Sequence, residues 1–409
     1  MLLSSAFREQ VKKTKDIAQI EEMKYNVGYS TGFLPLDFLN GDCFEINSRL
    51  YYQIGIVDGS INAFISESGG GKTTFTIQSA ANIVRPFKTS CVFMEAVESG
   101  SALQRAMQLT GFGPEEFKDR FICRDAGITT ESFQERVKMI YSLKMQHYDE
   151  YAYDTGIIDD YGKPVIKLEP TVVILDSLKM VIPEKISEEA TNMAGAQTAK
   201  ANSDMFIRLL PMCRQANIII LVINHITTSG IGSVMPQKSA LAYLKQGESL
   251  PGGKSVTYLN NNIIRLDRKS KLKETEGFGI DGTLVNAEII KSRTNKAGKG
   301  CTLVFDQAYG YDPDLSLFMM LKENNIFEGA GAYLRLPGLE DVKFSQKNFK
   351  QTLYTNTEFY NKFIEICLNL LREQLLNRYN ARKEMERVKS DVVSPYQAIL
   401  NQLQNQQSA

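Results

Sequence analysis

The chain has 409 residues with 47 basic and 47 acidic side chains, so its formal net charge is zero. This balance says little about partners, because local basic segments bind nucleic acid even in a neutral chain. Six cysteines without a CxxC pair argue against a zinc site or a disulfide framework. No signal-peptide pattern is present, and no stretch approaches the roughly 20 apolar residues of a membrane span. We therefore expect a cytoplasmic protein that does not enter membranes.

The first 50 residues are expected to form a separate N-terminal piece. Phe7, Val11 and Ile17 recur among charged residues with the spacing of a helix. The segment STGFLPLD, residues 30–37, then leads toward the core.

Residues 51–315 are expected to form an α/β core, because apolar runs alternate there with helical stretches. The clearest runs are INAFI (61–65), CVFM (91–94), TVVIL (171–175) and IIILVI (218–223). They are apolar throughout, which predicts a mostly parallel sheet covered by helices on both faces. Residues 287–292 and 301–305 are expected to add a hairpin, and residues 148–164 a surface insertion.

Two long segments fit neither a helix nor a strand pattern. Residues 227–253 show no sustained period, and a loop of this length is usually functional or disordered, whereas residues 183–200 are polar and directly follow a strand. The remaining residues, 316–409, are expected to form a small C-terminal region. It contains a helical stretch from about 358 to 388, which is more often a packed surface helix than a partner site, and a polar tail.

A glycine-rich segment, SESGGGKTT at residues 66–74, follows a buried strand and precedes a helical pattern. This context predicts a phosphate-binding loop for a nucleotide with Mg²⁺, in which backbone N–H groups surround the phosphates. Lys72 would meet the terminal phosphates and Thr73 the metal. The predicted nucleotide contacts are Glu67, Ser68, Gly69, Gly70, Gly71, Lys72, Thr73 and Thr74.

Polar side chains end three other apolar runs, where ligands bind in parallel sheets. Asp176 is expected to hold Mg²⁺ through water, and Glu95 or Glu98 to polarise the attacking water. Asn224 and His225 stand just before the second long segment, where a polar group could sense a phosphate and relay its presence. For each acid a solvated or helix-capping role is the alternative, and for the histidine a structural one.

The glycine-rich segment and the polar residues that end the three other apolar runs follow one another in an order that resembles the RecA family of strand-exchange ATPases. The resemblance is closest to the bacteriophage recombinases of the T4 type. The similarity covers roughly residues 28–340, with individually modest motifs in a specific order. The supporting segments are STGFLPLDFLNG (30–41), INH (223–225), Gly252-Gly253, IIKSRTNK (289–296) and GAGAYLRLPG (329–338).

The resemblance implies a RecA-like P-loop ATPase core and several residue roles. His225 would sense the γ-phosphate, while Lys291 and Arg293 would reach the ATP of a neighbouring subunit. Glu98 is the first choice for the catalytic glutamate, with Glu95 as its rival. The two long segments would face DNA, and the N-terminal piece would be a polymerisation arm. In the second segment the expected DNA contacts are Gly230, Lys238, Tyr243, Lys245, Gly252, Gly253 and Lys254.

The sequence departs from the family at three places. Ser66 replaces the first glycine of the loop, and Arg105 stands where relatives stack a tyrosine on adenine. A guanidinium can also stack on a base. The first long segment is acidic at Glu184, Glu188 and Glu189, which argues against phosphate contact there.

The resulting expectation is a DNA-dependent ATPase, encoded by a phage and acting in the bacterial cytoplasm. It would form a filament on single-stranded DNA, pair it with homologous duplex DNA in recombination and repair, and possess loader or single-strand-binding partners. A ring-forming helicase motor is the first alternative, although the 50-residue N-terminal piece is small for the collar of such motors. A nucleotide-gated mediator with little hydrolysis is the second.

Overall fold

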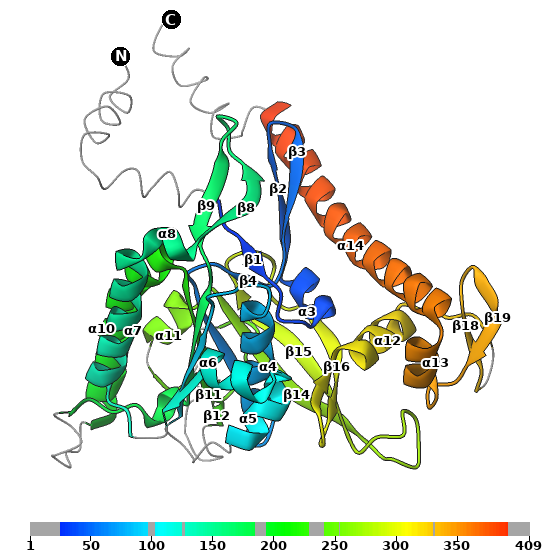
Figure 1. Ribbon diagram of the computed structural model, residues 1–409, viewed down its shortest axis with the longest axis horizontal. Coiled ribbons are helices and arrows are strands. Elements are labelled where there is room, and N and C mark those ends of the chain that lie inside the picture. Colours follow the sequence, from blue (N-terminus) through cyan, green and yellow to red (C-terminus); the bar gives the residue numbers. More distant parts are fainter. Residues whose placement is uncertain are drawn as a thin grey trace, which may run out of the picture.

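The computed structural model describes residues 25–96, 103–124, 127–184, 194–228, 241–252, 254–329 and 332–391. The protein is an α/β fold around a nine-stranded sheet in the order β17-β16-β15-β14-β5-β11-β10-β6-β7 (Figure 1). The strands are β5 (Ile61–Ser66), β6 (Val92–Ala96), β7 (Phe121–Arg124), β10 (Thr171–Asp176), β11 (Ile218–His225), β14 (Asn262–Leu272), β15 (Gly282–Ser292), β16 (Gly300–Asp306) and β17 (Gly310–Asp312).

The sheet is mostly parallel. From β14 through β7 every neighbouring pair is parallel, whereas β14–β15, β15–β16 and β16–β17 are antiparallel. All residues of β5 are buried, as expected for a strand covered on both faces. The structure thus confirms the predicted parallel core and the predicted hairpin, which is β15–β16.

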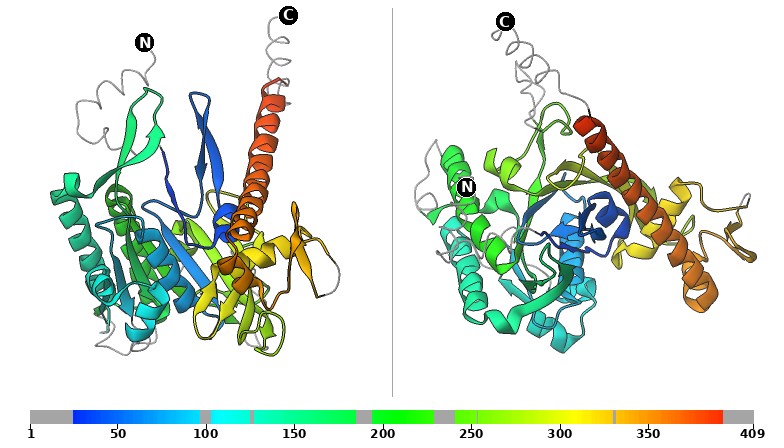
Figure 2. Two further views of the ribbon diagram at one scale, coloured as in Figure 1. Left: turned by 45° about the vertical axis from the view of Figure 1, so that its right-hand side comes forward. Right: turned by 90° about the horizontal axis from the view of Figure 1, so that it is seen from above.

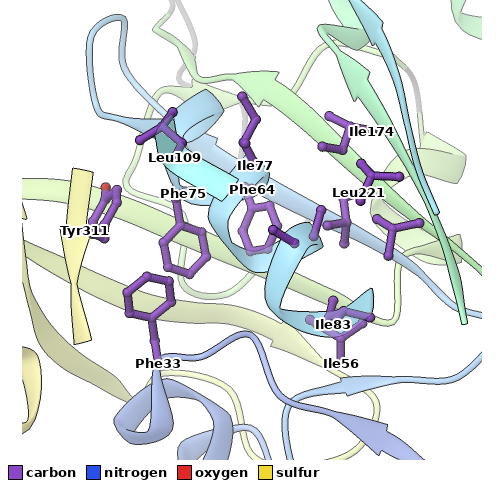
Figure 3. Packing of buried hydrophobic residues seen from close by; sticks show 14 of the residues in the cluster. Phe33, Ile56, Phe64, Phe75, Ile77, Ile83, Leu109, Ile174, Leu221 and Tyr311 are labelled. Atoms are coloured by element: carbon purple, nitrogen blue, oxygen red, sulfur yellow. The ribbon is translucent and has the colours of Figure 1, made fainter. Parts of the chain in front are cut away.

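Helices cover both faces of the sheet (Figure 2). On one face α4 and α5 pack on alternate residues of the central strands, and Phe75 of α4 stacks on Phe33 with ring centroids 5.0 Å apart (Figure 3). On the other face α7 and α10 pack on the intervening residues. These core helices and their connections are α4 (Lys72–Val84), α5 (Leu103–Thr110), α6 (Pro114–Arg120), α7 (Thr130–Gln146), α8 (Tyr148–Tyr151), the 3₁₀ turn Leu178–Met180, α10 (Ala194–Ala216) and α11 (Lys254–Leu259).

A third hydrophobic cluster joins the C-terminal helices to α3. The long α14 buries an apolar stripe there, and its last turns reach the hairpin β2–β3, where Arg382 pairs with Asp42 at 2.7 Å. The elements concerned are α3 (Leu34–Leu39), β2 (Asp42–Ile46), β3 (Arg49–Gln53), α12 (Pro313–Glu323), β18 (Leu334–Leu336), β19 (Leu339–Phe344), α13 (Phe349–Thr355) and α14 (Thr357–Asp391).

Short two-stranded pairs complete the fold. One is the predicted insertion, which forms the hairpin β8–β9 beside the sheet. The pairs are β1 (Gly28–Tyr29) with β4 (Ile56–Val57), β8 (Ala152–Ile158) with β9 (Pro164–Leu168), and β12 (Thr227–Thr228) with β13 (Glu248–Ser249).

The expected domain borders fall inside elements rather than between them. The border at residue 50 lies within β3, and the border at 315 lies within α12. The helix expected around Phe7 to Ile17 lies outside the described residues. Among the helices that the structure describes, none is long and apolar enough to cross a membrane.

Candidate functional site

Parallel pairing brings the ends of three central strands to one edge of the sheet. His225 at the end of β11 lies opposite Ser66 at the end of β5, and Asp176 at the end of β10 lies opposite Ile223. The glycine-rich segment follows β5 directly, so it lies at this same edge. We call residues 67–71 the glycine loop.

The glycine loop ends where α4 begins, and Lys72 folds back across it. Gly71 caps the helix in a left-handed conformation (φ 79°), and the side chains of Glu67 and Ser68 are exposed. Lys72 is only 5 % exposed, and its ammonium donates to the Glu67 carbonyl at 2.9 Å and to Ser66 Oγ at 3.0 Å. The first backbone N–H groups of α4 have no partner within the helix. A cation and a helix N-terminus therefore meet here, which is the arrangement that binds anions.

The predicted metal ligands are in direct contact. The Thr73 hydroxyl of α4 donates to Asp176 Oδ2 of β10 at 2.7 Å. A hydroxyl and a carboxylate at this distance fit Mg²⁺, which takes few protein ligands and relies on substrate phosphates and water. The described residues contain no cluster of three or more metal-ligating side chains that would form a closed cage.

Ser66 has a structural explanation. It belongs to β5, is 1 % exposed, and is not among the described non-glycine residues with positive φ. The chain therefore needs no glycine at this position. The Ser66 hydroxyl instead donates to the Glu67 carbonyl at 2.7 Å and accepts from Lys72, which adds a contact that glycine could not make.

The Ser66 side chain leaves room only for a glycine at position 70. A Cβ atom on Gly70 would clash with Ser66 Oγ and would lie 3.2 Å from the Leu266 carbonyl oxygen. On the outer side of the loop, the buried Tyr311 hydroxyl reaches the Gly70 carbonyl at 3.3 Å, and Arg268 of β14 donates to the Gly69 carbonyl. Our sequence analysis missed both of these contacts.

His225 lies next to Lys72 and close to the second long segment. Its Nδ1 and the Lys72 Nζ are 3.5 Å apart. The neighbouring Asn224 is fully buried and donates to the Pro251 carbonyl at 2.8 Å. The tip of β11 is therefore tied to the far end of the segment through Asn224, with β12 and β13 pairing in between.

A buried ion cluster anchors the same end of that segment. Arg265 of β14, 2 % exposed, donates to both oxygens of Glu248 at 2.7 and 2.9 Å and lies 2.7 Å from Asp267. The two contacts to Arg265 lower the pKa of Glu248 despite its burial. Because this pair is bidentate, it fixes both position and orientation.

Glu95 faces away from this site. Side chains alternate along a strand, and Met94 packs on the α4 side. Glu95 is 1 % exposed and pairs with Arg136 of α7, with 2.7 Å between Nε and Oε1. Burial raises the pKa of its carboxyl, against the opposing effect of Arg136. This placement favours a structural ion pair over water activation, and Glu98 lies outside the described residues.

Arg105 holds a turn rather than leaving its guanidinium free. It donates to the carbonyls of Gln307 and Ala308, in the connection between β16 and β17. The turn is packed against the first part of α4, because a Cβ on Gly310 would lie 3.0 Å from Thr74 Cγ2. Tyr309 projects from this turn and is 80 % exposed. An exposed aromatic ring is a surface on which a base could stack, and the sequence alone did not point to Tyr309.

Lys291 and Arg293 lie at the opposite edge of the sheet. They are at the C-terminal end of β15, which runs antiparallel to β14 and so ends far from the glycine loop. Lys291 donates to the carbonyls of Thr257, Tyr258 and Asn260 at 2.6–2.9 Å. Burial and the nearby Arg293 lower the pKa of Lys291 to about 8.

The expected DNA contacts are only partly described. Tyr243 is 47 % exposed, and Lys245 extends into solvent with its ammonium 3.8 Å from Asp267. Gly252 has φ 101°. Leu244, between Tyr243 and Lys245, is buried in the core. Gly230, Lys238 and Gly253 lie outside the described residues, and of Lys254 only the backbone, at the start of α11, is described.

The first long segment is described only at its ends. Its acidic Glu184 accepts a hydrogen bond from Thr129 at 3.1 Å, while residues 185–193, including Glu188 and Glu189, lie outside the described residues. From residue 194 onward the segment belongs to α10.

Comparison with known proteins adds no assignment, since neither a protein-family model nor a curated protein matches the sequence.

Replacing Gly70 should reveal the dependence of this glycine on Ser66. If the glycine loop binds Mg-ATP, as the sequence predicts, Gly70→Ala should weaken that affinity by about tenfold, or ~1.4 kcal/mol, because the new methyl group displaces the Ser66 hydroxyl. In the Ser66→Gly background, Gly70→Ala should weaken Mg-ATP affinity by about threefold or less, since only the Leu266 carbonyl remains close to the new methyl group. Ser66→Gly alone should shift the affinity by less than about tenfold.

Calorimetric titration of the four proteins measures this coupling. Gly113→Ala is the control, because a Cβ there meets no atom within 4 Å. An equal loss from Gly70→Ala in both backgrounds would show that Ser66 and Gly70 are independent.

Glu95→Gln should destabilise the protein without abolishing the ATP turnover that the sequence predicts. The change leaves the Arg136 guanidinium beside a neutral amide in a buried site, which should cost about 1–3 kcal/mol of unfolding free energy. Arg136→Gln is the matched variant and should behave in the same way. Urea denaturation and steady-state hydrolysis measure the two effects; normal stability with lost turnover would restore Glu95 as the base.

Proposed function

We propose that the protein is a DNA-dependent ATPase that polymerises on single-stranded DNA and promotes homologous pairing and strand exchange. The observation that carries the ATPase part is the contact of Thr73 with Asp176 beside Lys72, at the carboxyl edge of a parallel sheet. A helix N-terminus, a lysine and a hydroxyl–carboxylate pair are together the groups that phosphoryl transfer requires. The RecA-like P-loop core is part of this proposal.

The glycine loop would bind the phosphates of ATP with backbone N–H groups. Gly69 and Gly71 both have positive φ, a conformation that lets successive N–H groups converge on an anion. Lys72, which holds the loop carbonyls, would also place its charge against phosphate oxygens. Thr73 and Asp176 would hold Mg²⁺, which neutralises charge on the phosphates when bound.

Glu98 is the proposed group that orients the attacking water and accepts its proton. His225, with its ring beside the Lys72 ammonium, is placed to respond to a terminal phosphate. Its backbone neighbour Asn224 binds the far end of the second long segment, so a shift of His225 would reach that segment. This connection supports coupling between nucleotide state and DNA contact.

DNA binding would involve the second long segment and the residues that follow it. Lys245 is exposed next to the Arg265–Glu248 ion pair, which would hold the backbone in place for a phosphate contact by Lys245. Tyr243 offers a half-exposed ring for stacking. In a filament each subunit repeats these few contacts, which would let a neutral chain bind DNA.

Self-association into a filament accounts for the position of Lys291 and Arg293. Both lie at the edge of the sheet opposite the glycine loop of their own chain, so an ATP that they reach would have to belong to another subunit. An ATP site completed in this way would couple hydrolysis to assembly. A helicase ring would use the same geometry, and it remains the alternative without an observation in its favour.

A nucleotide-gated mediator with little hydrolysis gains one observation. Glu95 is engaged by Arg136, so Glu98 is the remaining candidate for the catalytic base. If Glu98→Gln left the hydrolysis rate unchanged while Lys72→Ala abolished nucleotide binding, the mediator would be favoured over the recombinase.

ATP hydrolysis measured with and without single-stranded DNA tests the proposed function. We expect single-stranded DNA to stimulate ATP turnover at least about tenfold, and ATP to induce filaments visible by electron microscopy. The reason is that the adjacent residues His225 and Asn224 contact Lys72 and the second long segment, respectively. Lys72→Ala should abolish hydrolysis. An ATP hydrolysis rate that single-stranded DNA does not change, together with an absence of filaments, would exclude a recombinase.

A further inference from the structure

β14 runs along one side of the glycine loop. It pairs in parallel with β5, with Arg265 opposite Ile65, so the residues after Arg265 continue beside the loop. The Leu266 carbonyl oxygen lies 3.2 Å from the Cβ position of Gly70, and the Arg268 guanidinium lies 3.3 Å from that of Gly69. The strand therefore forms a wall of the candidate nucleotide site.

The two arginines of this wall have different surroundings. Arg265 is buried, and Glu248 and Asp267 compensate its charge. Arg268 is exposed, and it donates a hydrogen bond to the Gly69 carbonyl. Within the described part of the chain, no carboxylate forms an ion pair with Arg268.

The alternation of side chains along β14 turns Arg268 toward the α4 side. Ile264 and Leu266 belong to the core cluster beneath α4, and Arg268 continues this series. Ile263 and Arg265 face the other side, where Ile263 packs with α7 and α10. The arginine and the N-terminus of α4 therefore share one face of the sheet.

Among the residues that the structure describes, the guanidinium has one hydrogen bond, to Gly69, which leaves most of its N–H donors available. Arginine has five N–H donors in a planar fork that matches two oxygens of a phosphate. A glycine at position 69 keeps the space beside the guanidinium open, since a Cβ there would already lie 3.3 Å from it. Lys72, in contrast, is 5 % exposed and lies beneath the loop.

We propose that Arg268 binds the phosphates of the nucleotide held by the glycine loop of its own chain. This inference rests on the proposed ATPase function and adds a second cation to the site, on the β14 side of the loop. The guanidinium would keep or exchange its bond to the Gly69 carbonyl and direct its free N–H groups at phosphate oxygens. Arg268 is thus a binding residue supplied within the subunit, unlike Lys291 and Arg293.

The competing interpretation is that Arg268 only holds the loop in place. Tyr311 supplies a matched control, because its hydroxyl contacts the adjacent Gly70 carbonyl at 3.3 Å without carrying charge. Lys271 supplies a second control, as an exposed cation three residues further along β14. Phosphate binding depends on the charge at residue 268, whereas loop support depends on a donor to a carbonyl.

The test is equilibrium binding of Mg-ATP and Mg-ADP to wild type, Arg268→Lys, Arg268→Gln, Tyr311→Phe and Lys271→Ala at low and high salt. We expect Arg268→Gln to lower Mg-ATP affinity about tenfold, through loss of a charge-assisted contact. Arg268→Lys should recover about half of this loss on a logarithmic scale, since it keeps the charge but not the fork. The difference between wild type and Arg268→Gln should shrink at high salt.

Tyr311→Phe and Lys271→Ala should each stay within about threefold of wild type, because neither removes a phosphate contact. Thermal unfolding without nucleotide should be unchanged for both Arg268 variants, since the residue is exposed. If wild type binds Mg-ATP and the affinity of Arg268→Gln is within twofold of wild type, the inference about Arg268 is overturned while the proposed function stands. Equal losses for the Lys and Gln variants also overturn it in favour of loop support, and wild type that binds no Mg-ATP overturns the proposed function as well.

Discussion

The parallel pairing of β5, β11 and β10 is the constraint on which the candidate site depends. Backbone hydrogen bonds along these buried strands set His225 opposite Ser66 and Asp176 opposite Ile223. Slipping one strand by one residue would turn its apolar side chains to the other face, so the two helix-covered cores hold this register. The chemistry at the edge of the sheet is therefore positioned by hydrophobic packing below it.

The same constraint explains how a serine can begin the glycine-rich segment. Ser66 is still part of β5, and the turn is made by glycines further on, of which Gly69 and Gly71 have positive φ. The hydroxyl of Ser66 occupies the space over Gly70 and binds Lys72. The serine thus adds a contact within the loop that a glycine could not make. Arg268 of β14 and Tyr311 hold the loop further by donating to the carbonyls of Gly69 and Gly70.

The sequence predicted the features that follow from local patterns, and missed those that depend on tertiary neighbours. Uniformly apolar runs predicted β5, β6, β10 and β11 closely. The outer half of β14 is charged, and its role beside the glycine loop appears only once the strand is paired with β5. For the same reason sequence reasoning could not find Arg268, the Glu248–Arg265 pair, or the side of the sheet that Glu95 faces.

The central claim is that the glycine loop, Lys72 and the Thr73–Asp176 pair bind the phosphates of a magnesium nucleotide. Equilibrium binding of labelled ATP, with and without Mg²⁺, to wild type, Lys72→Ala and Thr73→Ala measures it most directly. We expect magnesium-dependent binding to wild type, little binding to Lys72→Ala, and binding to Thr73→Ala that no longer responds to magnesium. Absence of binding to wild type, or equal binding to all three proteins, would contradict it.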